Sequence, residues 1–94
     1  MTSLDTDKVV AAASALNSLL MGLPQSERRD KALYHLDRLQ RAVAAWHQEA
    51  VRFAAFTVNK SVHDSPEWGP QVAEAMEALR VSLAESGHDF LKGN

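Results

Sequence analysis

Cysteine is absent from this chain of 94 residues, and glycine and proline are scarce, with four and three residues. Without cysteine there is no disulfide, no thiolate zinc site and no cysteine nucleophile, a composition that fits a reducing compartment. The glycines are isolated, so no glycine-rich loop is available to hold a phosphate. The acidic start and the polar residues within the first apolar stretch argue against a signal peptide or membrane span. We therefore expect a soluble, cytoplasmic protein.

The sequence also lacks the arrangements that catalysis or metal binding requires. No two of its four histidines stand three or four positions apart, the spacing that would place two ligands on one helix face. The serines stand at expected helix caps or among alanines, away from any glycine-rich nucleophile turn. We therefore expect no enzyme activity, no cofactor and no metal site. The histidines are His35, His47, His63 and His88.

A long stretch without proline or glycine, from Ser26 to Lys60, predicts one continuous helix. Its apolar side chains recur at alternating spacings of four and three, as in the seam of a coiled coil. This helix would be roughly 50 Å long, well over the ~26 Å diameter of a compact chain of this size. We therefore expect another subunit to cover part of the seam. The seam consists of Ala32, Leu36, Leu39, Val43, Trp46, Ala50, Phe53 and Thr57.

Two further helices are expected, at about residues 6–21 and 70–86, with a separate turn at residues 66–68. Ser26 is the expected N-cap of the central helix, 26–60. The fold class is all-α: a small helical hairpin or bundle with one long central helix, a single domain over residues 1–94 that assembles as a homo-oligomer. The expected buried positions in the outer helices are Val9, Ala13, Leu16, Leu20 and Leu23, and Trp68, Val72, Met76, Leu79 and Leu83.

The formal net charge of −2 is unevenly distributed: residues 1–25 carry −1, residues 26–60 carry +3 and residues 61–94 carry −4. The basic middle and the acidic C-terminal third could dock within a chain or between subunits. Ordinary solvated helix faces are the alternative interpretation. Proteins that bind duplex DNA normally have a dominant basic surface. We therefore expect neither duplex nucleic acid nor a membrane as a partner.

Five residues near the start of the central helix are candidates for ligand binding. Arg28, Arg29 and Lys31 crowd its first turns, where positive charge opposes the helix dipole. They either form an anion site or have i,i+4 partners and solvent around them. Tyr34 is either a half-buried packing residue or a platform for a base whose phosphate Arg38 or the other basic residues would bind.

Residues 8–52 carry a family resemblance. An alanine-rich helix leads into a turn and then into a helix with a tryptophan. These features resemble the helical-hairpin proteins by which phages sequester cyclic oligonucleotide immune signals, the anti-CBASS and anti-Thoeris sponges. That family has an Arg-Glu pair where this chain has Glu27-Arg28, and its tryptophan comes one turn earlier than Trp46. The residues at the family spacing are Pro24, Ser26, Ala32, Leu33, Leu36 and Asp37.

The resemblance implies a protein that is not an enzyme and that captures cyclic di- or trinucleotides stoichiometrically, which blocks antiphage immunity. It also implies a homo-oligomer, typically a hexamer, with ligand pockets between subunits. If the protein is phage-encoded, the place of action is the host cell cytoplasm. The alternative is a helical protein-binding module, another phage inhibitor or an oligomeric adaptor, that acts through a charged helix face.

Overall fold

The computed structural model describes residues 3–45 and 47–87, with side chains from Asp7 onward. Within these ranges the chain forms four α-helices and one short 3-10 turn, and no strand. The all-α class is therefore confirmed. The elements are α1 (Ser3–Met21), α2 (Glu27–Ala45), α3 (Gln48–His63), η1 (Pro66–Trp68) and α4 (Pro70–Glu85).

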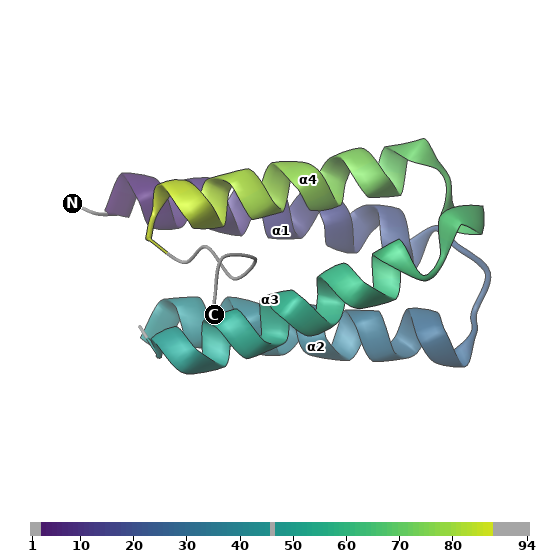
Figure 1. Ribbon diagram of the computed structural model, residues 1–94, viewed down its shortest axis with the longest axis horizontal. Coiled ribbons are helices and arrows are strands. Elements are labelled where there is room, and N and C mark those ends of the chain that lie inside the picture. The colour runs from purple at the N-terminus through teal and green to yellow at the C-terminus, as the bar shows by residue number, and fades with distance from the viewer. Residues whose placement is uncertain (1–2, 46, 88–94) are drawn as a thin grey trace.

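Successive helices run in opposite directions and form an up-and-down four-helix bundle (Figure 1). Helix α1 packs beside α2 and α4, and α3 packs beside the same two helices on the other side. The α1–α4 pair and the α2–α3 pair form two layers (Figure 1). The bundle measures 37 × 25 × 20 Å. No helix among the described residues is long and apolar enough to cross a membrane.

The apolar stripes predicted for the outer helices form the core. In α1 the four positions from Val9 to Leu20 are buried, and Leu23 packs against them from the following loop. In α4 the four positions from Val72 to Leu83 are buried, and Trp68 packs against them from η1. Spacing of three and four residues was therefore sufficient to predict the inward faces of α1 and α4.

The predicted central helix at 26–60 is wrong, because the chain forms two antiparallel helices there instead of one. Helix α2 ends at Ala45 and α3 begins at Gln48. Between them His47 is extended, with φ −89° and ψ 92°. Its N–H donates to Ala42 O at 3.1 Å and its C=O accepts from Val51 N at 2.9 Å. His47 therefore closes one helix and opens the next.

Burial explains why the chain turns without a proline or glycine. A 50 Å helix would project beyond the bundle's 37 Å long axis and leave its apolar face in water. Turning gives up a few helical hydrogen bonds, each worth about 0.5–1.5 kcal/mol net. Each fully buried valine or leucine contributes about 1.5–3 kcal/mol. Val51 and Val58 of α3 are fully buried on the folded-back segment, so burial outweighs the lost bonds.

The turn also changes which face of the second half is buried. From Ala32 to Val43 the predicted seam is buried, but inside the same chain. Beyond the turn Ala50 and Phe53 are exposed, and Trp46 lies outside the described residues. The buried positions of α3 are instead Val51, Ala54, Ala55, Val58, Ser61 and Val62. The first half of the seam is therefore covered within the chain. Because the long helix does not form, its length is no longer a reason to expect a second subunit.

The remaining boundaries depend on local signals. Ser26 caps α2, since its Oγ accepts from Arg29 N at 3.1 Å, as expected. Helix α3 continues to His63, past the expected end at Lys60. The separate turn at 66–68 is confirmed as η1. Gly69 then joins η1 to α4 with φ +96°, a backbone conformation that favours glycine.

We expect Leu36→Ala to lower the free energy of unfolding by about 2–5 kcal/mol, because Leu36 is fully buried between helices and its loss leaves a cavity. Val10→Ala, at an exposed position of α1, is the matched control and should change the free energy of unfolding by about 0.5 kcal/mol or less. Urea unfolding followed by circular dichroism measures both. Equal effects of the two substitutions would contradict this assignment of the core.

Candidate ligand-binding site

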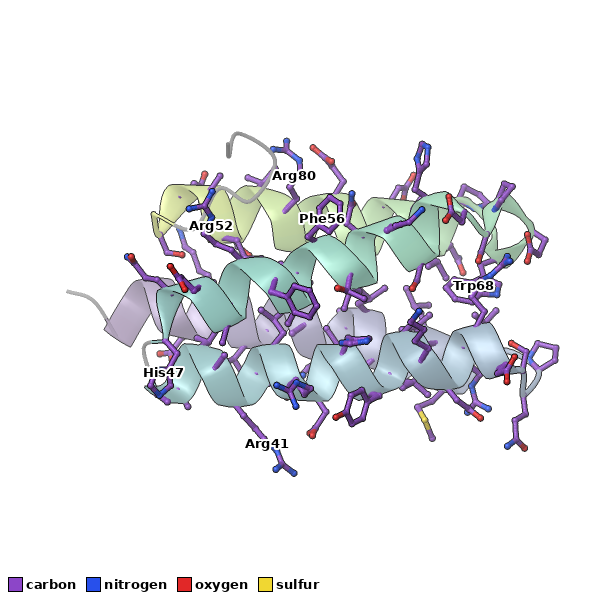
Figure 2. All side chains as sticks on the ribbon, turned by 60° about the horizontal axis from the view of Figure 1, so that its bottom comes forward. Arg41, His47, Arg52, Phe56, Trp68 and Arg80 are labelled. Atoms are coloured by element: carbon purple, nitrogen blue, oxygen red, sulfur yellow. The ribbon has the colours of Figure 1, made fainter. Side chains whose placement is uncertain are left out.

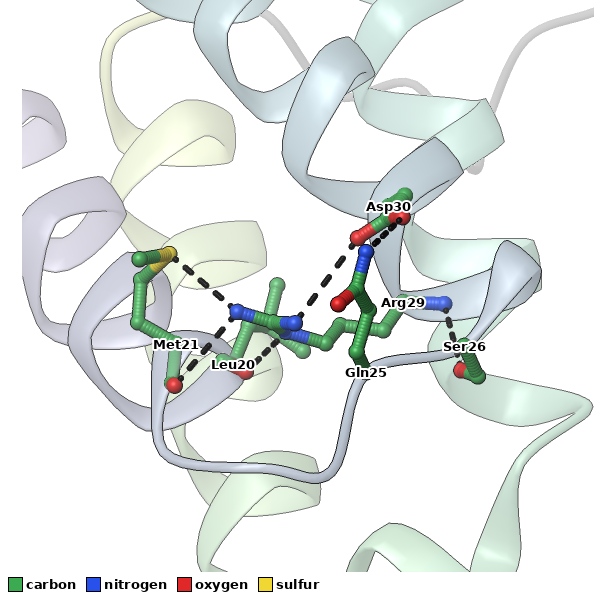
Figure 3. A network of polar contacts seen from close by, with 6 residues as sticks. All are labelled: Leu20, Met21, Gln25, Ser26, Arg29 and Asp30. Carbon is green, nitrogen blue, oxygen red and sulfur yellow. Dashed lines mark hydrogen bonds and ion pairs between the residues drawn. The ribbon is translucent and has the colours of Figure 1, made fainter.

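Arg29 binds the end of α1 (Figure 3). Its Nε donates to Leu20 O at 3.0 Å, and Nη2 lies 3.5 Å from Met21 O and 3.6 Å from Met21 Sδ. Nη1 lies 3.8 Å from Asp30 Oδ1. The side chain is only 12% exposed. Arg29 therefore adds charged donors to carbonyl groups in the last turn of α1, where Leu20 O also accepts from Leu23 N at 3.1 Å.

Arg28 reaches in the other direction, to the end of α3. Its Nη1 donates to Asp64 O at 3.0 Å and to Ser65 Oγ at 3.2 Å. The same atom lies 3.8 Å from Glu67 Oε2 of η1. This side chain is 52% exposed, so solvent screens its ion pair and the pair contributes little to stability.

These contacts explain why two arginines stand where their own helix disfavours them. The N-terminus of α2 lies at the same end of the bundle as the C-termini of α1 and α3 (Figure 1). Positive charge there interacts unfavourably with the dipole of α2, whose N-terminus is nearby, but favourably with the dipoles of α1 and α3, whose C-termini are nearby. The structure thus gives both guanidinium groups intramolecular partners. A ligand would have to compete with those partners.

A groove of about 750 Å³ opens at this end of the bundle, and we call it the end groove. Its charges balance, with Arg28, Lys31 and Lys60 against three carboxylates. Lys60 Nζ lies 3.0 Å from Asp64 Oδ2, which holds the pKa of that carboxyl below its usual range. A balanced lining gives little selectivity for an anion. The end groove is lined by Ser26, Glu27, Arg28, Lys31, Thr57, Lys60, Ser61, Asp64, Glu67 and Trp68.

Halfway along the bundle, Tyr34, His35, Arg38 and Phe53 form an aromatic–arginine cluster on α2 and α3. The His35 ring meets Tyr34 edge-on with centroids 5.2 Å apart and Phe53 edge-on at 6.3 Å. The Arg38 guanidinium lies 5.8 Å from the Tyr34 ring centre, and its Nη1 donates to Tyr34 Oη at 3.3 Å. Tyr34 is 57% exposed and Phe53 is 64% exposed. The cluster therefore exposes two aromatic side chains and a guanidinium to solvent.

A second groove, of about 360 Å³, adjoins this cluster, and we call it the α2–α3 groove. Both Arg41 and His47 line this groove; His47 lies at the turn between the two helices, and the Arg41 side chain extends from α2 on the side away from α3 (Figure 2). None of its described lining residues carries a carboxylate; the nearby Asp37 pairs with Arg41 at 3.1 Å. Its lining is therefore basic and apolar. The lining residues are Arg38, Arg41, Ala42, Ala45, His47, Ala50 and Phe53.

Comparison of the chain with protein-family models, with curated proteins and with solved structures finds no match.

The five predicted site residues are divided among three places. Arg29 holds the end of α1, while Arg28 and Lys31 line the end groove. Tyr34 and Arg38 meet in the aromatic–arginine cluster. Within the described residues, no group of three metal-binding side chains is placed to hold a metal ion.

Sequence reasoning missed four residues of the cluster and its groove: His35, Arg41, His47 and Phe53. Phe53 was assigned to the seam because its spacing matched, and the turn at His47 carries no proline or glycine signal. The i,i+4 spacing of Tyr34 and Arg38, and of Asp37 and Arg41, was visible in the sequence. The sequence did not show that these residues of α2 lie beside α3.

Burial lowers the pKa of His35, and the positive charges of Lys31 and Arg38 lower it further. Nδ1 is buried without a hydrogen-bond partner among the described residues. A proton on this nitrogen would have no acceptor beside two cations, so the ring is neutral at neutral pH. The cluster thus holds an uncharged imidazole between two aromatic rings.

We expect Arg29→Ala to lower the free energy of unfolding by about 1–3 kcal/mol, because it leaves the end of α1 without its charged donor. Arg41→Ala removes only an exposed i,i+4 ion pair, so it should cost about 0.3–0.5 kcal/mol. Chemical denaturation of both variants measures the difference. An Arg29→Ala protein as stable as wild type would show that this contact does not hold the bundle end.

The pKa of His35 gives a second prediction. Because folding lowers this pKa, the unfolded chain binds the proton more readily. The free energy of unfolding should therefore fall as pH drops below about 6.5 and level off below the native pKa. His35→Gln removes this contribution. NMR titration of the imidazole and urea unfolding at several pH values test it, and a native pKa at or above 6.5 would contradict it.

Proposed function

We propose that this protein is a non-enzymatic binding protein that sequesters cyclic di- or trinucleotides on the exposed surface of α2 and α3. The observation that carries the proposal is the α2–α3 groove, where basic side chains meet the exposed Phe53 ring, next to the exposed Tyr34, without a carboxylate among the described lining residues. The resemblance over residues 8–52 supplies the ligand class.

Charge favours the α2–α3 groove over the end groove. Arg28 and Arg29 already hold main-chain carbonyl groups, and carboxylates face the lysines of the end groove. In the α2–α3 groove, by contrast, Arg38 donates only to the Tyr34 hydroxyl among its described contacts, and the carboxylate that pairs with Arg41, that of Asp37, lies outside the lining. A phosphate there would accept charge-assisted hydrogen bonds from Arg38 and Arg41.

The exposed rings provide the second half of the recognition. Base stacking on an aromatic side chain is worth about 1–3 kcal/mol and requires no particular base. Tyr34 and Phe53 expose more than half of their surface beside the groove. At about 360 Å³ the groove is at the small end of ligand pockets. It would hold one base and its phosphate rather than a whole cyclic dinucleotide.

A helical protein-binding module is the second candidate. The exposure of Tyr34 and Phe53 favours it, because aromatic residues and arginine dominate the binding energy of protein interfaces. The two candidates differ on one point. A sequestering protein retains a small molecule with no other protein present, whereas an adaptor does not.

Native mass spectrometry with a panel of cyclic di- and trinucleotides tests the proposal. We expect the wild-type protein to gain whole ligand masses that are returned intact on denaturation. Replacing Arg38 and Arg41 together with alanine should weaken binding at least about 100-fold, because two charge-assisted contacts are lost.

Arg52→Ala, which removes an exposed arginine of α3 outside the groove, is the matched control and should bind like wild type. Circular dichroism verifies that each variant is folded. If the wild-type protein retains no nucleotide, the protein-binding candidate replaces this one. If binding survives the loss of both arginines, the ligand occupies another site.

A further inference from the structure

The outer side of α3 carries an exposed stripe of four residues, which we call the outer stripe: Glu49, Phe53, Phe56 and Lys60. They are spaced by four, three and four residues, so they stand in line on one helix face. All four are exposed, including Phe53 at 64% and Phe56 at 51%. Figure 2 shows Phe56 on the outer side of α3. The buried residues of α3 occupy the opposite side of the helix.

Two neighbouring exposed phenylalanines need a physical explanation in a chain with six aromatic residues. Single exposed apolar residues are ordinary, but adjacent aromatic rings on one helix face are typical of an interaction surface. Within the bundle they contribute little, because the core of α3 is already formed by its inner face. The outer stripe therefore has a surface suited to another helix.

The outer stripe is complementary to itself. It is symmetric about the midpoint between residues 54 and 55, with the phenylalanines as the inner pair and the charged residues as the outer pair. If a second α3 lies antiparallel across this midpoint, Phe53 of one copy faces Phe56 of the other. Glu49 of one copy then faces Lys60 of the other. Each contact occurs twice, as a two-fold axis requires.

We propose that this protein forms a two-fold dimer in which the outer stripes of two α3 helices pack antiparallel. The occupant is a second copy of this chain because each exposed charge at the ends of the stripe has its opposite at the symmetric position. Lys60 already pairs with Asp64 of its own helix at 3.0 Å. Its ammonium group has three donors, so it can serve both carboxylates. This proposal does not depend on nucleotide binding.

Sedimentation equilibrium of the full chain over a wide range of concentrations tests the dimer. We expect the wild-type protein to be dimeric. Phe56→Glu should weaken the dimer by at least about 30-fold, because it places two carboxylates, one from each chain, against the phenylalanines beside the axis. Phe56 lies outside the α2–α3 groove, so this variant leaves the nucleotide site intact.

Charge reversal tests the register. Glu49→Lys places like charges opposite each other twice, and so does Lys60→Glu, so each should weaken the dimer by about 10-fold. The double variant restores both pairs and should return to within about threefold of wild type. Glu74→Lys makes the same charge change on α4, away from the stripe, and is the matched control.

Disulfide cross-linking tests whether the two α3 helices are antiparallel. Because the native chain has no cysteine, only the introduced cysteines can form a disulfide. A mixture of Glu49→Cys and Lys60→Cys proteins should form a disulfide between chains, since these positions face each other. Either variant alone should not, because its two copies of one position would be about 16 Å apart, beyond the ~7 Å limit for a disulfide.

Four results would overturn the proposal. The first is a wild-type protein that is monomeric at every concentration. The second is a dimer that Phe56→Glu leaves unchanged. The third is a double charge variant weaker than both single variants, and the fourth is cross-linking of Glu49→Cys with itself. Because nucleotide binding is measured separately on the wild-type protein, failure of the dimer and failure of the proposed function are distinguishable.

Discussion

The antiparallel packing of α2 against α3 is the interaction on which the rest of this structure depends. It is possible only because the chain turns at His47, and the turn is favoured because both segments have an apolar face to bury. Once α3 lies beside α2, its inner face completes the core with α4. The same packing brings Phe53 to His35, which is far from it in the sequence and whose ring also meets Tyr34.

The end of the bundle shows how tertiary structure can reverse the sign of a local effect. Two arginines in the first turn of a helix are unfavourable when that helix is considered alone. In the bundle Arg28 and Arg29 stand between two helix C-termini and hold a carbonyl group of each. The same positions looked like an anion site in the sequence because the helices they serve were not yet beside them.

The surface of the α2–α3 layer has two chemically different regions. Near the turn, the α2–α3 groove combines arginine and exposed rings and suits a small anionic ligand with a planar base. Along α3, the outer stripe combines two phenylalanines with opposite charges at its ends and suits a second copy. Phe53 belongs to both regions, so in the dimer it would pack against Phe56 of the second chain, and Tyr34 would remain as the ring available for base stacking.

The sequence by itself determined the all-α class, the inward faces of α1 and α4, the cap at Ser26 and the turn at 66–68. These features depend on spacing and local capping, which act within a few residues. Tertiary structure alone decided the turn at His47, the buried face of α3 and the roles of Arg28 and Arg29. Each of these features depends on burial or charge contacts between segments that are distant in the chain. Local sequence propensities do not encode such contacts.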